Sequence, residues 1–100
     1  MPLAIPVNLG RIASFCDKWK VRELSLFGSV LREDFGPQSD VDVLVSFAPD
    51  SPWSYWDWPE TIADLESIFG RKVDLVLKEG LKNPFRRHEI LRTAQVIHAA

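Results

Sequence analysis

The strongest structural signals in this chain lie in two short segments, LFGSVLR (residues 26–32) and SDVDVLV (residues 39–45). The first closes an alternating stretch, Val21 to Phe27, which predicts a short strand that ends at Gly28-Ser29. The second opens Val41 to Phe47, whose β-branched residues predict a more deeply buried strand. The sequence therefore predicts two strands joined through a glycine-containing connection.

Further elements are predicted on both sides of these strands. Helical spacing of apolar residues predicts a first helix capped by Asn8, a second that follows an Asp57–Glu60 capping box, and a last one over 84–97. A third strand is predicted over 72–77. The apolar residues expected to be buried on the first and last helices are Leu9, Ile12, Phe15, Cys16 and Trp19, and Ile90, Leu91, Ala94 and Ile97. We therefore expect an α/β (α+β) fold, a small mixed sheet of three or more strands packed on helices, as one domain over residues 1–100.

Three aspartates occupy positions that favour metal binding. Asp40 and Asp42 are two residues apart at the start of the second strand, so their side chains point to the same face. Two adjacent carboxylates repel each other, and a divalent cation such as Mg²⁺ compensates for this repulsion. Asp74 lies within the third strand and joins them if the two strands are neighbours. Each acid alone is more simply explained as a solvent-facing residue, whereas the three together with Gly28 favour a metal site.

The Gly28-Ser29 pair ends a strand just before a predicted turn. A glycine at such a position allows the backbone to approach a phosphate closely, and free N–H groups in the following turn bind anions. The pair is a common turn sequence and by itself is weak evidence. Its spacing from Asp40 and Asp42 makes the combination specific.

The combined pattern resembles the signature of the DNA polymerase β-like nucleotidyltransferase superfamily, and most closely its minimal nucleotidyltransferases (MNT proteins). The segment GRKVDLV (residues 70–76) is similar to the family's third-aspartate segment. The resemblance implies a nucleotidyltransferase fold that uses ATP as nucleotide donor and two Mg²⁺ ions. It implies that Asp40, Asp42 and Asp74 are catalytic and bind the metal. Gly28, Ser29 and Arg32 would then bind the nucleotide phosphates.

The MNT resemblance also implies a partner. Many members of this family act as antitoxins and resemble enzymes that transfer AMP to a tyrosine hydroxyl of a HEPN ribonuclease toxin and so silence it. Two alternatives remain open at this point. One is a catalytically idle antitoxin that neutralises the toxin by binding alone, and the other is a nucleotidyltransferase for another acceptor.

The charge, hydropathy and cysteine content of the chain limit the partners and the cellular location that we expect. The formal net charge of -2 does not favour direct nucleic-acid binding, although Lys78, Lys82, Arg86, Arg87 and Arg92 make the last third locally basic. No apolar run is long enough to span a membrane, and the single cysteine permits no internal disulfide, so we expect a cytoplasmic protein. Trp53, Tyr55 and Trp56 form an aromatic cluster that is either an exposed protein interface or a cover folded over the domain.

Overall fold

The computed structural model describes residues 7–28 and 40–99, and these form three α-helices and four β-strands. The strands form one mixed sheet in the order β3-β2-β1-β4. In chain order the elements are α1 (Leu9–Trp19), β1 (Val21–Phe27), β2 (Val41–Phe47), η2 (Tyr55–Asp57), α2 (Trp58–Phe69), β3 (Val73–Leu77), η3 (Lys78–Gly80), α3 (Pro84–Thr93) and β4 (Gln95–Ala99), where η marks a short 3₁₀ turn. The predicted fold class is confirmed.

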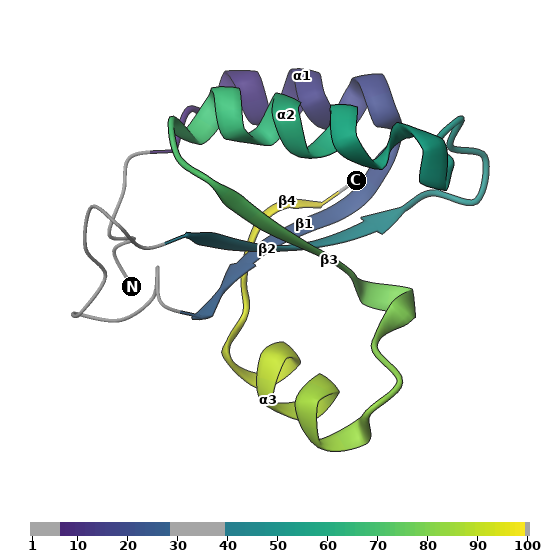
Figure 1. The fold of residues 1–100 in the computed structure, drawn as a ribbon, viewed down its shortest axis with the longest axis vertical. Helices are drawn as coiled ribbons and strands as arrows, with labels where there is room; N and C mark the ends of the chain where they lie inside the picture. Colours follow the sequence, from purple (N-terminus) through teal and green to yellow (C-terminus); the bar gives the residue numbers. More distant parts are fainter. Residues whose placement is uncertain (1–6, 29–39, 100) are drawn as a thin grey trace.

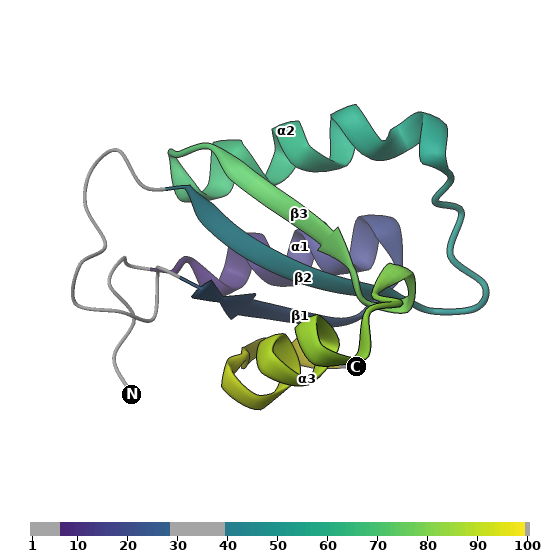
Figure 2. The same ribbon diagram turned by 60° about the horizontal axis from the view of Figure 1, so that its bottom comes forward.

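The sheet separates two helical layers. Helices α1 and α2 lie on one face of the sheet and α3 lies on the other (Figure 1). Strand β1 pairs antiparallel with both β2 and β4, whereas β2 pairs parallel with β3. A parallel pair needs a crossover connection, and α2 supplies it (Figure 2). This crossover brings the third predicted strand beside the second.

Helix α1 begins at the predicted cap. The Asn8 side chain accepts a hydrogen bond from the Arg11 backbone N–H at 3.1 Å, and the residue after the helix, Lys20, adopts a left-handed conformation that ends it. Ile12, Phe15, Cys16 and Trp19 are buried against the sheet. Leu9 was predicted to be buried and is 62% exposed, because it lies in the first turn, beyond the edge of the packed face.

Helix α2 is followed by Gly70, which ends it in a left-handed conformation with φ 69°. The predicted Asp57–Glu60 capping box is wrong. The Asp57 carboxylate instead accepts hydrogen bonds from the backbone N–H and the hydroxyl of Ser54, at 2.9 and 3.2 Å. The turn η2 precedes the helix directly, and it uses the side chain that the helix would otherwise have as its cap.

Successive side chains of a strand point to opposite faces of the sheet, so the strands contribute to two separate hydrophobic cores. Val41, Val43 and Val45 of β2 pack under α1 and α2 in the larger core. Leu44 packs on the opposite face with Phe27 and Ile90 in a smaller core beneath α3. The face of the sheet that α3 covers is called the α3 face below.

The predicted C-terminal helix is too long. Helix α3 ends at Thr93, and Gln95–Ala99 forms strand β4, which pairs with β1. Ala94 has φ -61° and ψ 138°, an extended conformation that turns the chain from the helix into the strand. The β-branched residues Val96 and Ile97 suit a strand, and the open edge of β1 provides backbone partners for it. Leu91, predicted to be buried, is 37% exposed.

The burial of Cys16 leads to a testable prediction. The side chain is 2% exposed, and burial raises the pKa of its thiol to about 12. The thiolate is the reactive form, so iodoacetamide should not modify the folded protein at pH 8.5, and intact-mass measurement should show modification only after denaturant is added. Because the folded pKa lies above the unfolded value of about 8.5, the folding stability that this thiol contributes should decrease as pH rises past about 8.5. Stoichiometric modification without unfolding would contradict this burial.

Candidate active site

The parallel pairing of β2 with β3 places two predicted site residues next to each other. Asp42 is the register partner of Asp74. Both occupy alternate positions of strands whose other side chains fill the larger core, so both lie on the α3 face. Asp42 is half-buried and Asp74 is exposed, which leaves the pair accessible from that face. A non-local pairing thus joins two acids that are 32 residues apart in the sequence.

Gly28 lies directly beside this acidic pair. The residue before it, Phe27, is the register partner of Asp42, and Gly28 has φ 74°, which side chains disfavour. A Cβ atom added to Gly28 would lie 2.1 Å from Oδ2 of Asp42. The missing side chain therefore provides the space in which the Asp42 carboxylate lies. The sequence predicted this glycine for phosphate binding and did not predict its contact with Asp42.

The remaining predicted site residues are less fully defined. Asp40 is exposed and lies one residue before β2, close to the same end of the sheet. Ser29 and Arg32 lie outside the described residues. Within 7–28 and 40–99, no three His, Cys, Asp or Glu side chains are grouped as a metal site in their present positions. The acids that the structure brings together are therefore Asp42 and Asp74.

The donor chemistry of this region fits Mg²⁺. Carboxylate oxygens are its preferred protein ligands, and Mg²⁺ sites in phosphoryl-transfer enzymes commonly use one or two carboxylates together with substrate phosphates. Asp42 and Asp74 supply such a pair in register, and Gly28 leaves space beside one of them. Such a site needs only a small protein contribution, because the nucleotide itself completes the metal's ligand shell.

A polar network fixes the opposite end of the α3 face. The hydroxyl of buried Ser46 donates a hydrogen bond to the Glu79 carboxylate and accepts one from Arg22 at 3.2 Å. Lys78 forms an ion pair with Glu23 at 3.0 Å. These contacts hold η3 against β1 and β2. They therefore determine where the segment between η3 and α3 begins.

The aromatic cluster is divided by the structure. Of the two alternatives, Trp53 follows the second: it packs on the larger core and stacks on Phe47 with ring centroids 4.5 Å apart. Trp58 also meets Trp53 edge-on. Tyr55 and Trp56 remain 76% and 93% exposed. The interface prediction therefore applies only to these last two rings.

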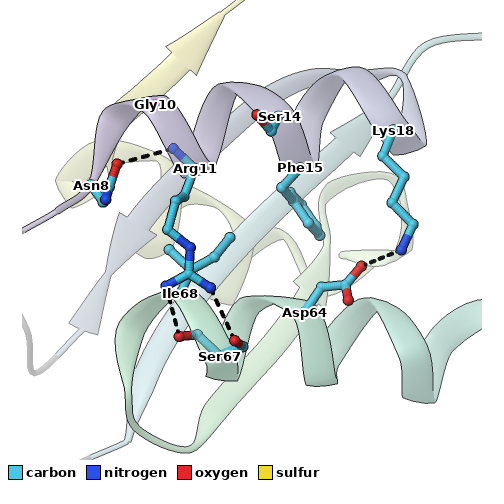
Figure 3. Close-up of a pocket in the computed structure, with 9 residues that line it drawn as sticks. All are labelled: Asn8, Gly10, Arg11, Ser14, Phe15, Lys18, Asp64, Ser67 and Ile68. Carbon is cyan, nitrogen blue, oxygen red and sulfur yellow. Dashed lines mark hydrogen bonds and ion pairs between the residues drawn. The ribbon is translucent and has the colours of Figure 1, made fainter.

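A groove of about 470 Å³ lies between α1 and α2 (Figure 3). These two helices cover the face of the sheet opposite the α3 face, on which Asp42 and Asp74 lie. Arg11 crosses it to donate hydrogen bonds to the backbone oxygen and the hydroxyl of Ser67, at 3.2 and 3.0 Å. Lys18 crosses it to the Asp64 carboxylate at 2.9 Å. These polar groups satisfy one another and connect the two helices, so we assign the groove a structural role.

Comparison with known proteins identifies the family. A model of the nucleotidyltransferase domain matches residues 12–97, which include β1, β2, β3 and the acids at their ends. The chain belongs to the nucleotidyltransferase domain family. Two curated relatives place it among the minimal nucleotidyltransferases. A protein of Methanocaldococcus jannaschii with the provisional name protein adenylyltransferase is 39% identical over 74 residues, 74% of each chain. The protein adenylyltransferase MntA of Thermococcus cleftensis is 40% identical over 67 residues, 67% of this chain and 66% of that one.

Solved structures agree with this family assignment. A chain provisionally described as a minimal nucleotidyltransferase superposes with a TM-score of 0.70 at 31% identity, covering 87% of this chain and 86% of that one. A toxin–antitoxin complex with AMP-PNP contains a chain that superposes with a TM-score of 0.73 at 20% identity, covering 94% of this chain and 75% of that one. A complex of a tri-AMPylated Shewanella oneidensis HEPN toxin with MNT antitoxin contains a chain that superposes with a TM-score of 0.64 at 20% identity. The match covers 92% of this chain and 70% of that one. At such low identity the last two establish only that this nucleotidyltransferase domain shares their fold.

No helix among the residues that the structure describes is long and apolar enough to cross a membrane.

Proposed function

We propose that this nucleotidyltransferase is a Mg²⁺-dependent protein adenylyltransferase that transfers AMP from ATP to a tyrosine hydroxyl of a HEPN toxin and thereby neutralises it. The observation that carries the proposal is the in-register pair of Asp42 and Asp74, with Gly28 leaving space beside the first. The names of the MNT-type relatives support the reaction, and the HEPN complexes of similar fold support the partner.

Each predicted site residue has a role in this reaction. Asp40, Asp42 and Asp74 would hold two Mg²⁺ ions, which when bound neutralise negative charge on the attacking and leaving oxygens. Gly28 and Ser29 would bind the β- and γ-phosphates through their backbone N–H groups and the serine hydroxyl, and Arg32 would add a positive charge. Asp74, which is exposed at the open edge of the pair, would also accept the proton of the incoming hydroxyl.

The catalytic contribution of the chain would consist mainly of positioning. Transfer of a phosphorus-centred group is promoted chiefly by orientation and charge stabilisation, and asks for little other chemistry from the protein. A short sheet that positions two carboxylates beside the bound nucleotide would therefore suffice. We further propose that residues 1–100 act as a single minimal nucleotidyltransferase domain, with the acceptor hydroxyl presented by the bound toxin.

The direct test is a reaction of the purified protein with ATP, Mg²⁺ and the protein encoded by the neighbouring gene, which the proposal expects to be a HEPN toxin. The toxin should gain one or more adenylyl groups on tyrosine by mass spectrometry, and its ribonuclease activity should decrease in parallel. Replacing the modified tyrosine with phenylalanine should abolish both changes. If the ribonuclease activity decreases without ATP and without any gain in mass, the chain neutralises its partner by binding alone, and the adenylyltransferase proposal is wrong.

A further inference from the structure

A lysine that the sequence did not single out lies at the edge of the acidic site. Lys72 immediately precedes β3, and its backbone oxygen accepts a hydrogen bond from the Val41 N–H at 2.9 Å. Val41 lies between Asp40 and Asp42 in the sequence. Hydrogen-bonded strands run about 4.8 Å apart, so the Lys72 backbone lies within one strand spacing of the segment that carries these two acids.

The charge environment of Lys72 differs from that of most other lysines in the chain. Lys18, Lys20 and Lys78 each form an ion pair with a carboxylate at 2.9 to 3.0 Å. Lys72 is exposed and takes part in none of the ion pairs that the described residues form. Its ammonium group is therefore available to a ligand, and its flexible four-carbon stem allows it to reach one.

We propose that Lys72 binds the triphosphate of the nucleotide and stabilises the pyrophosphate that leaves. The proposal rests on the function proposed above. Three carboxylates and a triphosphate carry more negative charge than two Mg²⁺ ions neutralise, so a further cation beside the site would stabilise the bound state. Lysine is a common phosphate ligand that acts as a point charge. Lys72 lies at the start of β3 and Gly28 lies at the end of β1, and β2 runs between these two strands. Lys72 would therefore contact the nucleotide from the other side of β2.

The alternative is that Lys72 only offsets repulsion among the carboxylates. The two roles differ in ligand dependence. A lysine that contacts the triphosphate affects ATP much more than AMP, because AMP lacks the β- and γ-phosphates. A lysine that only offsets the carboxylate charges affects the binding of Mg²⁺ and the stability of the fold. Its removal changes the affinities for ATP and AMP by the same factor.

The test compares three variants of the full-length protein: Lys72→Gln, Lys72→Arg and Lys82→Gln. Lys82 is the matched control, because it is also exposed and forms no ion pair with the described residues, but it lies in the segment between η3 and α3. Calorimetry measures the binding of Mg²⁺–AMP-PNP and of AMP, and the transfer assay separates KM for ATP from kcat.

We expect Lys72→Gln to weaken Mg²⁺–AMP-PNP binding and to raise KM for ATP by about tenfold or more, the usual effect of losing a charge-assisted hydrogen bond. Its affinity for AMP should change less than threefold, Lys72→Arg should retain most of the affinity, and Lys82→Gln should resemble the wild type. Equal affinity of Lys72→Gln and wild type for Mg²⁺–AMP-PNP, or equal losses for AMP-PNP and AMP, would overturn the proposal. A wild-type protein that binds Mg²⁺–AMP-PNP but modifies no partner would contradict the proposed function and leave the Lys72 comparison valid.

Discussion

Replacing Asp42 with asparagine is expected to lower AMP transfer by about 10³-fold or more, with the fold intact. Metal-based charge stabilisation is worth several kcal/mol, and each 1.36 kcal/mol corresponds to about a factor of ten in rate. The amide keeps the shape of the carboxylate but lacks the negative charge that would hold Mg²⁺ in the proposed site. Asp42 is paired in register with Asp74, so removing one charge also relieves repulsion. Thermal stability without Mg²⁺ should therefore be unchanged or slightly higher.

This combination of lost activity and retained stability separates a catalytic role from a structural one. Asp17→Asn is the matched control, because Asp17 is an exposed aspartate on α1, on the other side of the sheet from the α3 face. It should transfer AMP at the wild-type rate. Single-turnover kinetics and thermal melts of both variants, each with and without Mg²⁺, provide the measurement. An Asp42→Asn variant that keeps more than a tenth of the wild-type rate would contradict a role for Asp42 in the proposed metal site.

Replacing Gly28 with alanine is expected to damage both stability and activity, for two separable reasons. The backbone at Gly28 has φ 74°, a conformation that costs a non-glycine residue about 1–2 kcal/mol. The new Cβ would also lie 2.1 Å from Oδ2 of Asp42, so that the carboxylate must move. Displacing a catalytic group by about 1 Å can cost about 10²-fold in rate, and we expect a loss of at least that size.

Gly70 provides a control that isolates the backbone cost. It has a similar positive φ of 69°, but a Cβ added there would meet no atom within 4 Å. Gly70→Ala should therefore lose about 1–2 kcal/mol of stability and keep its AMP transfer. Chemical denaturation and the transfer assay on both alanine variants give the comparison. Equal activity of the two variants would show that the contact between Gly28 and Asp42 has no catalytic importance.

The sequence predicted the local parts of the site more completely than their arrangement. The spacing of Gly28, Asp40 and Asp42 within one short stretch indicated the nucleotidyltransferase family, and the family match confirms it. The pairing of Asp42 with Asp74 depends on a parallel register between strands that α2 separates, and only the fold determines it. The contact between Gly28 and the Asp42 carboxylate is likewise invisible in a motif, because it depends on the backbone angle at the strand end.

The errors in the prediction have a common physical cause. Ile90, Leu91 and Ala94 have helical spacing, and Ile97 continues it, so local pattern alone extends the last helix too far. Pairing with β1 instead draws 95–99 into a strand, because an open sheet edge offers backbone hydrogen bonds that the sequence pattern does not reveal. The position of Trp53 could not be decided from the sequence for the same reason, since its stacking on Phe47 joins residues from separate elements.

The central claim is that this chain transfers a nucleotidyl group, and the position of the label in ATP tests it most directly. The protein, Mg²⁺ and the proposed HEPN partner are incubated in parallel with ATP labelled at the α-phosphate and with ATP labelled at the γ-phosphate. We predict that the partner acquires label from the α-phosphate only, and that Asp42→Asn abolishes this transfer. Label that arrives from the γ-phosphate, or transfer that persists undiminished in Asp42→Asn, would contradict the proposed reaction.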